Sequence, residues 1–380
     1  MIVKSQKIVL LGAEPASLIN FRAPLIKRLV ALGHEIHVAA KPAPPELIAA
    51  LVEMGATFQP VTFARTGMNP FRDLKTIVSL YSLFRTLRPD AVMCYTSKPV
   101  IYGAFAAFLA NVPRKIAMIT GLGYSFIDGS EYKRSLAKMF SKRLYSWALP
   151  LCTTVLFQNN DDRNEFDRLK LLKGVARVAV VNGSGVDTNH FTPVPLPEQP
   201  VFLMIARLLA DKGVREFAAA AGKVRYALPH AKFQLLGAID TSPNAISAQE
   251  LKLWQQQGIV YLGETKDVRP FISAASIIVL PSYREGTPRS VLEGMAMGRA
   301  IITTDVPGCR ETVMHGQNGL LVPVRDVETL AAAIVKLAKD AEEVVRMGKR
   351  SRQIALSKYE AETVAKDTAR KAGFDEEAAA

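Results

Sequence analysis

The sequence is poor in the residues that form covalent or metal cross-links. Only three cysteines, Cys94, Cys152 and Cys309, occur among 380 residues, and their wide spacing gives neither a disulfide framework nor a zinc motif. The five histidines are scattered, without the spacing of a metal site. We therefore expect a protein of a reducing compartment that holds no metal ion.

Long hydrophobic runs are also missing. The longest, residues 99–113, is too short to span a bilayer and is typical of a buried helix. The first residues, MIVKSQKIVLLG, resemble a lysine-flanked strand that ends in glycine, not a secretory signal. We therefore expect a cytoplasmic protein that is either soluble or bound peripherally to the inner face of the cell membrane.

Negative charge is scarce in the first half of the chain. The net charge of +13 comes from 48 basic and 35 acidic residues. Residues 1–192 hold 24 basic and 13 acidic residues, a net of +11, whereas residues 193–380 hold 24 and 22, a net of +2. A first half this basic predicts an anionic partner, either nucleic acid or acidic lipid.

Short apolar, β-branched runs alternate with helical patterns almost throughout. A strand-like run at residues 8–11 is followed by helical spacing over 18–32 and by another strand-like run at 35–39. The alternation recurs up to residue 181, and it restarts after residue 200. This order is typical of parallel sheets covered by helices on both faces, and it predicts an α/β fold.

The proline-rich segment TPVPLPEQP, residues 192–200, interrupts the alternation. Such a segment is a stiff linker, and 380 residues are too many for one ordinary core. We therefore predict an N-terminal domain over residues 1–192 and a C-terminal domain over 193–355. In the last segment, 356–380, we expect a helix that returns to the N-terminal domain and then a polar tail.

Two loops of the C-terminal domain carry chemistry suited to a diphosphate. The first, ARLLADKG, leaves the first strand of this domain, at the end of the strand where open parallel sheets bind ligands. Arg207 offers a planar fork for phosphate, and Lys212 offers a point charge near a helix start. Taken alone, the pair fits two solvated loop cations as well.

The second loop, LPSYREGTPRSVLE, joins a buried strand to a helix. Thr287 is predicted as the N-cap and Pro288 as the first helical residue, so the first turn presents free N–H groups to an anion. Gly286 lets the backbone approach a ligand closely. Glu293 can accept hydrogen bonds from ribose hydroxyls, and Glu285 lies nearer the reacting end. An ordinary capped helix with surface acids gives the same pattern.

The two loops together form a more specific signature. Glu285 and Glu293 are separated by seven residues and are followed by GMAMG, AIITTDVPG and NGLLV. With the preceding arginine and Lys-Gly, this pattern closely resembles glycosyltransferase family 4. That is a retaining family with the GT-B fold, in which two Rossmann-like doubly wound domains face each other across a cleft. The segment GVDTNHFTP is similar to the family's hinge-side motif, so the resemblance covers essentially the whole chain.

The resemblance implies catalytic roles for Arg207, Lys212 and Glu285. The two cations would hold the diphosphate and stabilise the leaving group in place of a metal, and Glu285 would hold the donor sugar. Front-side attack, with the departing phosphate taking the acceptor proton, would need no side-chain nucleophile and no cofactor beyond the co-substrate, a UDP-sugar. The residues implied for nucleotide-sugar binding are Gly263, Thr265, Gly286, Thr287, Ser290, Val291 and Glu293.

The N-terminal half resembles a narrower group. The segments LINFRAPLI, NPF, KPVIYG and TGLGYSF are similar to polyprenyl-diphosphate-sugar N-acetylgalactosaminyltransferases of bacterial glycan assembly. This implies a polyprenyl-diphosphate-linked acceptor, with candidate contacts at Arg22, Lys98, Gly121 and Gly123. Many family members place a histidine in the loop that reads Gly-Leu-Gly here, and this departure leaves the acceptor base unassigned.

A basic amphipathic pattern runs over residues 131–149, EYKRSLAKMFSKRLYSWAL. One stripe is apolar, and five positive charges accompany a single glutamate. The pattern indicates a helix at an anionic membrane surface, although an ordinary packed helix with a solvated basic face has the same features.

Three other classes of protein fit parts of the pattern. A GT-B sugar-nucleotide epimerase or hydrolase would share the fold, but it would need paired acid and base carboxylates and a histidine that we do not identify. A nucleic-acid-binding protein would explain the charge, but we recognise no binding module or aromatic platform, so no nucleic-acid partner is expected. A nicotinamide oxidoreductase lacks its Gly-x-Gly-x-x-Gly turn.

Overall fold

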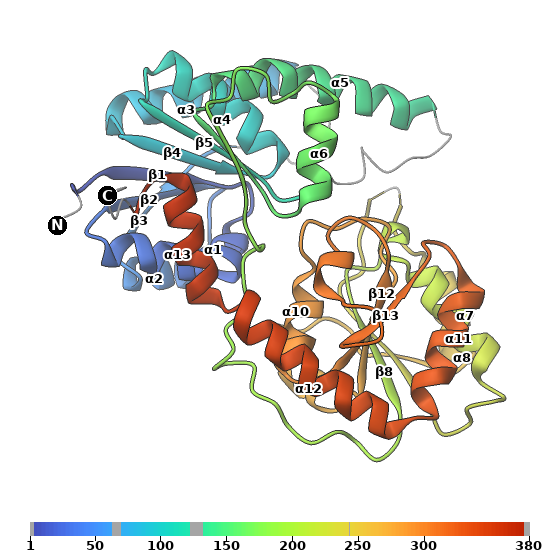
Figure 1. The fold of residues 1–380 in the computed structure, drawn as a ribbon. Helices are drawn as coiled ribbons and strands as arrows, with labels where there is room; N and C mark the ends of the chain where they lie inside the picture. The colour runs from blue at the N-terminus through green and yellow to red at the C-terminus, as the bar shows by residue number, and fades with distance from the viewer. Residues whose placement is uncertain (1–3, 63–69, 122–131, 243, 376–380) are drawn as a thin grey trace. The chain divides into compact units, whose positions relative to one another are not determined.

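The structure, a computed structural model, describes residues 4–62, 70–121, 132–242 and 244–375, with the backbone alone at 70–72, 132–138 and 140. The chain forms two compact units (Figure 1). One contains Met1–Ser184 with Glu362–Ala380, and the other contains Gly185–Ala361. The proline-rich segment therefore belongs to the second unit, because the chain enters that unit at Gly185, upstream of the boundary predicted at 193.

The first unit is built on a seven-stranded sheet in the order β3-β2-β1-β4-β5-β6-β7. All of its described strand pairs are parallel. Its central strands are apolar on both faces, as a sheet covered on both sides requires. The strands are β1 (Lys7–Leu11), β2 (Glu35–Ala40), β3 (Ala56–Pro60), β4 (Ala91–Tyr95), β5 (Arg114–Ile119), β6 (Thr154–Phe157) and β7 (Arg177–Val180).

Helices cover both faces of this sheet (Figure 1). Helices α3, α4 and α5 lie on one face, and α1, α2 and α13 lie on the other. Helix α1 begins with proline at its first position and stops just before Gly33, whose φ of +84° ends the helix. The helices in chain order are α1 (Pro15–Ala31), α2 (Pro45–Glu53), α3 (Pro70–Leu87), α4 (Ser97–Leu109), α5 (Tyr132–Ala148) and α6 (Asn160–Arg168), with a short 3₁₀ turn, η2, at Leu149–Leu151.

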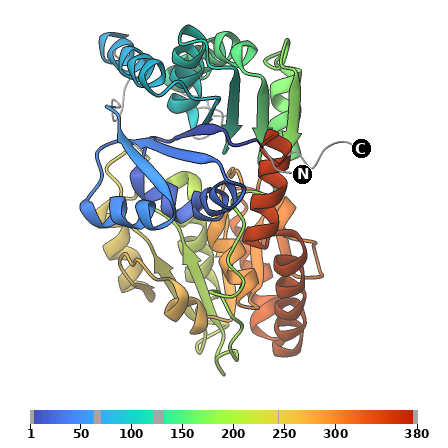
Figure 2. The same cartoon turned by 90° about the vertical axis from the view of Figure 1, so that its left-hand side faces the viewer.

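The C-terminal segment packs against the first unit. Helix α13 (Ala361–Ala372), red in Figures 1 and 2, buries Ala365, Ala369 and the following Phe374 among residues of α1 and the sheet. The Nε2 atom of His34 lies 3.1 Å from the Phe374 carbonyl, so this early histidine has a structural partner. We predicted this return over 356–380, and in the structure it starts at Glu362.

The second unit holds a six-stranded sheet in the order β10-β9-β8-β11-β12-β13, again parallel in every described pair. Residues of both faces join one continuous hydrophobic core. The strands are β8 (Val201–Ile205), β9 (Lys232–Leu236), β10 (Ile259–Tyr261), β11 (Ile277–Leu280), β12 (Ala300–Thr304) and β13 (Gly319–Val322).

Several helices of this unit begin at side-chain caps. Ser247 and Glu250 form a capping box at α8, and Asp326 and Asp340 accept N–H bonds at α11 and α12. The elements are the 3₁₀ turns η3 (Ala210–Lys212) and η4 (Arg310–Thr312) and the helices α7 (Val214–Val224), α8 (Ala248–Gln256), α9 (Arg269–Ser273), α10 (Arg289–Ala296), α11 (Val327–Ala338) and α12 (Ala341–Lys358).

Some elements differ from the sequence predictions. Strand β3 and helix α3 were not predicted, because β3 is a half-exposed edge strand and α3 exposes apolar side chains such as Leu74 and Val78. Helix α6 begins at Asn160, because the Asn159 side chain accepts the Asp162 N–H. Among the described residues, no helix is both long and apolar enough to cross a membrane.

Candidate active site

The predicted donor loops follow β8 and β11, the two adjacent strands at which the strand order of the second sheet reverses. The strand order runs outward from β8 on one side and from β11 on the other, so the β8–β11 pair is a topological switch point. In open parallel sheets ligands bind beyond the carboxyl ends of strands at such a point. The loop over residues 206–213 follows β8, and the loop over 281–288 follows β11.

These two loops contact each other closely. The Tyr283 N–H donates to the Asp211 carbonyl at 2.9 Å, and the Ser282 hydroxyl donates to the same oxygen at 3.1 Å. Gly213 has a φ of +75°, and an added Cβ would lie 2.0 Å from the Pro281 carbonyl oxygen. Glycine is therefore required here both for its backbone angle and for the close approach of the loops.

Lys212 and Glu285 form an ion pair across this contact. Lys212 Nζ lies 2.6 Å from Glu285 Oε1, and the side chains are 19% and 15% exposed. Burial alone would lower the pKa of Lys212, but the charge and hydrogen bond of Glu285, together with smaller contributions from Asp211 and Cys309, hold that pKa above its ordinary value. Lys212 is therefore a fixed positive charge directly beside the loop that enters α10.

Arg207 lies in the same loop but has a different partner. Its Nη1 atom is 3.1 Å from Asp240 Oδ2, in the segment after β9, and its side chain is 64% exposed. An ion pair this exposed contributes little to stability, so the guanidinium can change partners at low cost. Of the two predicted cations, Lys212 is held against the α10 loop and Arg207 against the loop after β9.

The start of α10 differs by one residue from the prediction. Pro288, with a ψ of 112°, is the N-cap residue, and α10 begins at Arg289, so Thr287 lies outside the helix. The predicted assignment of Thr287 as N-cap was wrong, because Pro288 takes an extended conformation that its fixed φ also allows. The N-cap residue makes no side-chain hydrogen bond to the helix and the first turn holds no acidic residue, so the dipole of this helix end favours an anion.

Glu293 lies one turn into α10 and is buried, whereas Ser290 is half-buried and Val291 fully buried. Arg289 Nε donates to Glu293 Oε1 at 2.7 Å. Burial raises the pKa of Glu293, and the charge of Arg289 opposes the shift without cancelling it. A carboxylate in this setting is poorly solvated, which makes it a strong acceptor for hydrogen bonds from a ligand.

A third loop supports the backbone at Glu285, although the sequence predictions gave it no role. The Glu285 N–H donates to the Pro307 carbonyl at 3.0 Å. Gly308 has a φ of +83°, and an added Cβ would lie 2.2 Å from the Glu285 carbonyl oxygen. Cys309 is fully buried beside these residues, and burial, with the nearby Glu285, raises its thiol pKa to about 12, so it is not an activated nucleophile.

Gly263 and Thr265 follow β10 at the same edge of the sheet. Gly263 has a φ of +78°, and its carbonyl accepts the Gly237 N–H at 2.8 Å. An added Cβ at Gly237 would lie 1.8 Å from the Ala206 carbonyl oxygen, so the segments after β8, β9 and β10 are stacked on one another. The Thr265 hydroxyl closes a turn with the N–H and carbonyl of Asp267.

Two family models match the chain. Residues 199–340 match the glycosyl transferases group 1, and residues 7–159 match the glycosyl transferase 4-like family. The chain belongs to these glycosyltransferases. The two matches together cover every described strand of both sheets except β7 and contain all of the loops described above.

Known proteins resemble the transferase along nearly its whole length. It is 29% identical over 92% of its chain to N,N'-diacetylbacillosaminyl-diphospho-undecaprenol alpha-1,3-N-acetylgalactosaminyltransferase of Campylobacter jejuni, covering 94% of that protein. Its structure is similar to sucrose-phosphate synthase of Thermosynechococcus elongatus, with a TM-score of 0.79, 18% identity and coverage of 96% and 98%. It is also similar to HepE of Anabaena in complex with UDP and glucose, with a TM-score of 0.76, 18% identity and coverage of 97% and 99%. These similarities show the GT-B fold.

The candidate acceptor residues of the first unit lie in different surroundings. Lys98 Nζ is 3.4 Å from Asp73 Oδ1, so its charge already faces a carboxylate. Gly121 follows β5 with a φ of +117°, and Gly123 falls outside the described residues. Arg22 is buried on α1, above the ring of Tyr95.

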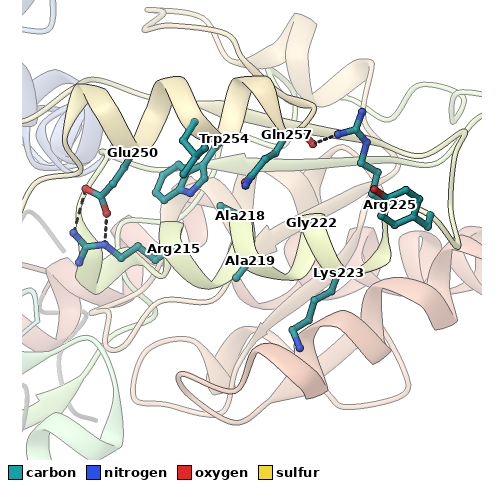
Figure 3. A pocket seen from close by; sticks show the side chains of 11 residues that line it. Arg215, Ala218, Ala219, Gly222, Lys223, Arg225, Glu250, Trp254 and Gln257 are labelled. Carbon is teal, nitrogen blue, oxygen red and sulfur yellow. Dashed lines mark hydrogen bonds and ion pairs between the residues drawn. The ribbon is translucent and has the colours of Figure 1, made fainter.

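A groove of about 660 Å³ lies between α7 and α8 of the transferase (Figure 3). Its charged groups already have partners: Arg215 pairs with Glu250, and Arg225 donates to the Gln257 carbonyl. None of the residues predicted for the donor lines this groove, so we assign it no part in the reaction. In the part of the chain that the structure describes, no group of three or more His, Cys, Asp or Glu side chains is arranged to hold a metal.

Proposed function

We propose that the transferase moves N-acetylgalactosamine, or another N-acetylhexosamine, from a UDP-sugar to a polyprenyl-diphosphate-linked saccharide, with retention of the anomeric configuration. The reaction would serve bacterial N-glycan, O-antigen or capsule assembly. The observation that carries the proposal is the Lys212–Glu285 pair, held beside the start of α10 at the switch point of the second sheet. The relative that matches 92% of the chain supports the choice of sugar and acceptor.

The donor is proposed to bind along the loops of the second unit. Its diphosphate would lie at the start of α10, where first-turn N–H groups and the Lys212 ammonium both favour negative charge. Glu293, a buried carboxylate, would accept hydrogen bonds from the ribose hydroxyls. Glu285, with the backbone of Gly286 and Thr287, would hold the sugar, and Gly263 and Thr265 would pass near the base.

The proposed chemistry needs no side-chain nucleophile. The acceptor hydroxyl attacks the anomeric carbon on the face from which UDP departs, the bond from that carbon to the phosphate oxygen breaks, and the departing phosphate takes the hydroxyl proton. Lys212 stabilises the charge that grows on the leaving phosphate, and the exposed Arg207 side chain adds a second positive charge. These two cations would take the place of a metal ion.

A screen of UDP-sugars for protection against thermal unfolding, followed by a transfer assay, tests the proposal. We expect UDP-N-acetylgalactosamine or another UDP-N-acetylhexosamine to raise the unfolding temperature most. With a polyprenyl-diphosphate monosaccharide, the same donor should give an α-linked disaccharide, identified by NMR of the anomeric proton. Conversion of the UDP-sugar without any acceptor would instead indicate an epimerase, and product with inverted configuration would overturn the retaining mechanism.

Because the proposed acceptor is attached to a membrane lipid, the transferase is also proposed to contact the membrane. Helix α5 is the element proposed to make this contact. In its described part, Met139 and Trp147 are 63% and 52% exposed, and Lys142 and Arg143 are exposed as well. The Arg143 guanidinium lies 5.0 Å from the centre of the Trp147 ring. Exposed aromatic and basic side chains on one helix are typical of binding to an anionic membrane surface.

Sedimentation with vesicles of anionic and of neutral lipid tests this contact. The double variant Lys142→Gln/Arg143→Gln should bind anionic vesicles more weakly, by about 1 kcal/mol for each charge removed. The matched control is Lys336→Gln/Lys339→Gln, which removes two exposed charges from the second unit. Equal losses in both variants, or none in either, would show that α5 is an ordinary packed helix.

A further inference from the structure

The first sheet has its own topological switch point, between β1 and β4. Gly12 follows β1 here, and Tyr95 ends β4. An added Cβ at Gly12 would lie 2.2 Å from the Tyr95 hydroxyl, so the tyrosine ring extends across the end of β1. That hydroxyl lies 3.3 Å from the Oγ atom of Ser17, in the first turn of α1. The carboxyl ends of both strands thus meet around one aromatic ring.

Arg22 of α1 lies on this ring without a charged partner. Its guanidinium carbon is 4.7 Å from the ring centre of Tyr95, and the residue is only 5% exposed. Its Nε atom has no hydrogen-bond partner among the described residues, and its one polar contact with them is a long one of 3.4 Å from Nη1 to the Phe21 carbonyl. Among the described residues no carboxylate pairs with it. Arginine is almost never buried this deeply unless it is paired.

A second buried arginine shows how a purely structural one is arranged in this chain. Arg299 is fully buried, and its Nε, Nη1 and Nη2 atoms donate to three carbonyl oxygens at 3.0–3.1 Å. Its position is therefore explained by the fold alone. Arg22 has no comparable set of acceptors, and an anion from outside the fold would supply both the charge and the acceptors that it lacks.

The backbone beside Tyr95 is strained. Thr96 has a φ of +69° and a ψ of 156°, a region that residues other than glycine rarely adopt. Such residues occur where a surrounding structure holds the backbone in place, and they cluster at ligand-binding sites. The strain lies directly beside the ring on which the Arg22 guanidinium rests.

We propose that Arg22 binds a phosphoryl group at the carboxyl ends of β1 and β4, with Tyr95 holding the guanidinium in position. Both substrates of the proposed reaction carry such a group, and the inference rests on that reaction. The planar guanidinium fork matches two phosphate oxygens, whereas a lysine at this position would supply the charge alone.

Steady-state kinetics of the full chain distinguish the two sources of the phosphoryl group. Arg22→Met removes the charge and keeps the length of the side chain. We expect it to raise the KM for one substrate by about ten- to a hundredfold. A rise for the polyprenyl-diphosphate acceptor assigns the group to the acceptor, and a rise for the UDP-sugar assigns it to the donor. Arg22→Lys should recover part of the loss, and Lys27→Met, which removes an exposed charge from the same helix, should match the wild type.

Thermal unfolding separates binding from a structural role. Because an unpaired buried cation is unfavourable in the fold, Arg22→Met should unfold at the same temperature as the wild type or at a higher one. A clearly lower unfolding temperature, with both KM values changed together or neither changed, would overturn the proposal.

A measurement with inorganic pyrophosphate does not depend on transfer activity. In the Lys212→Ala background, which removes the cation of the second unit, pyrophosphate should still raise the unfolding temperature. That protection should be lost in Lys212→Ala/Arg22→Met. Equal protection in both proteins, or none in either, would refute the phosphoryl subsite even if sugar transfer is confirmed. Protection that depends on Arg22 would support the subsite even if transfer fails.

Discussion

Lys212 is the residue on which the proposed chemistry depends most. It is the cation held by Glu285 beside the start of α10. We predict that Lys212→Ala lowers kcat by about 10²–10³-fold or more, because the leaving phosphate loses its nearest stabilising charge. The matched control is Lys223→Ala, since Lys223 is a half-exposed lysine on α7 that pairs with Glu328. Undiminished turnover of a folded Lys212→Ala protein would exclude the role proposed for this residue.

Glu293 gives a prediction with a definite sign in pH. Burial raises its pKa in the folded state, and Arg289 opposes this only in part. A group with a raised folded pKa loses its stabilising contribution as pH rises through that pKa, because the fold disfavours the carboxylate. Glu293→Gln should therefore unfold no more easily than the wild type at neutral pH. The difference between the two proteins should shrink below the ordinary glutamate pKa of about 4.3.

The same substitution should weaken donor binding, because an amide accepts hydrogen bonds from the ribose less well than a carboxylate does. We expect the KM for the UDP-sugar to rise about tenfold. Unfolding curves over a pH series and donor kinetics measure the two effects separately. A less stable variant with an unchanged donor KM would indicate that Glu293 is a structural residue.

At the level of single residues, the contacts within the candidate site could not be predicted from the sequence. It singled out Lys212 and Glu285 separately, but no local pattern pairs residues 73 positions apart. Nor did it predict the partner of Arg207, Asp240, which comes from the loop after β9. The buried state of Arg22 and the positive φ of Thr96 depend on how α1 and β4 pack, and neither residue type indicates them.

Gly308, in the loop after β12, packs against the loop that carries Glu285. Its backbone lies against the carbonyl groups of Glu285 and Gly286, and its φ is +83°. We predict that Gly308→Ala lowers stability by about 1–3 kcal/mol, because alanine is strained at this φ. It should also lower kcat/KM, because its Cβ would displace the Glu285 carbonyl.

A control at a glycine with free space tests that second effect. Gly316 has a φ of +75° and nothing within 4 Å of an added Cβ. Gly316→Ala should therefore cost stability without changing kcat/KM. Equal kinetic losses in the two variants would show that the displacement of the 285–286 loop is not the cause.

Whether an element was predicted depended on how clear its local signal was. Most strands with both faces buried were predicted from apolar runs. The edge strand β3 was not predicted because only part of it is buried. Helix α3 was not predicted because its exposed apolar side chains weaken its amphipathic pattern. The start of α10 was one residue out, since proline fits both the N-cap and the first helical position.

The whole molecule consists of two parallel-sheet units, and each has its candidate site at the topological switch point of its sheet. Each sheet reverses its strand order once near its middle, at β1–β4 and at β8–β11. At each of these points a glycine and a cationic side chain lie at the carboxyl ends of the strands. They are Gly12 and Arg22 in the first unit and Gly213 and Lys212 in the second. The sequence predicted two such sheets from alternation alone, but strand order arises from long-range pairing that alternation does not specify.

Hydrogen exchange with and without UDP tests the central claim most directly. Binding should slow exchange of backbone N–H groups in three segments of the second unit, at 206–213, 263–265 and 285–293. The same segments should show little slowing in Lys212→Ala at equal UDP concentration, and Lys223→Ala should behave as the wild type. If UDP left these three segments unchanged, or slowed exchange only in the first unit, the assignment of the donor site would be contradicted.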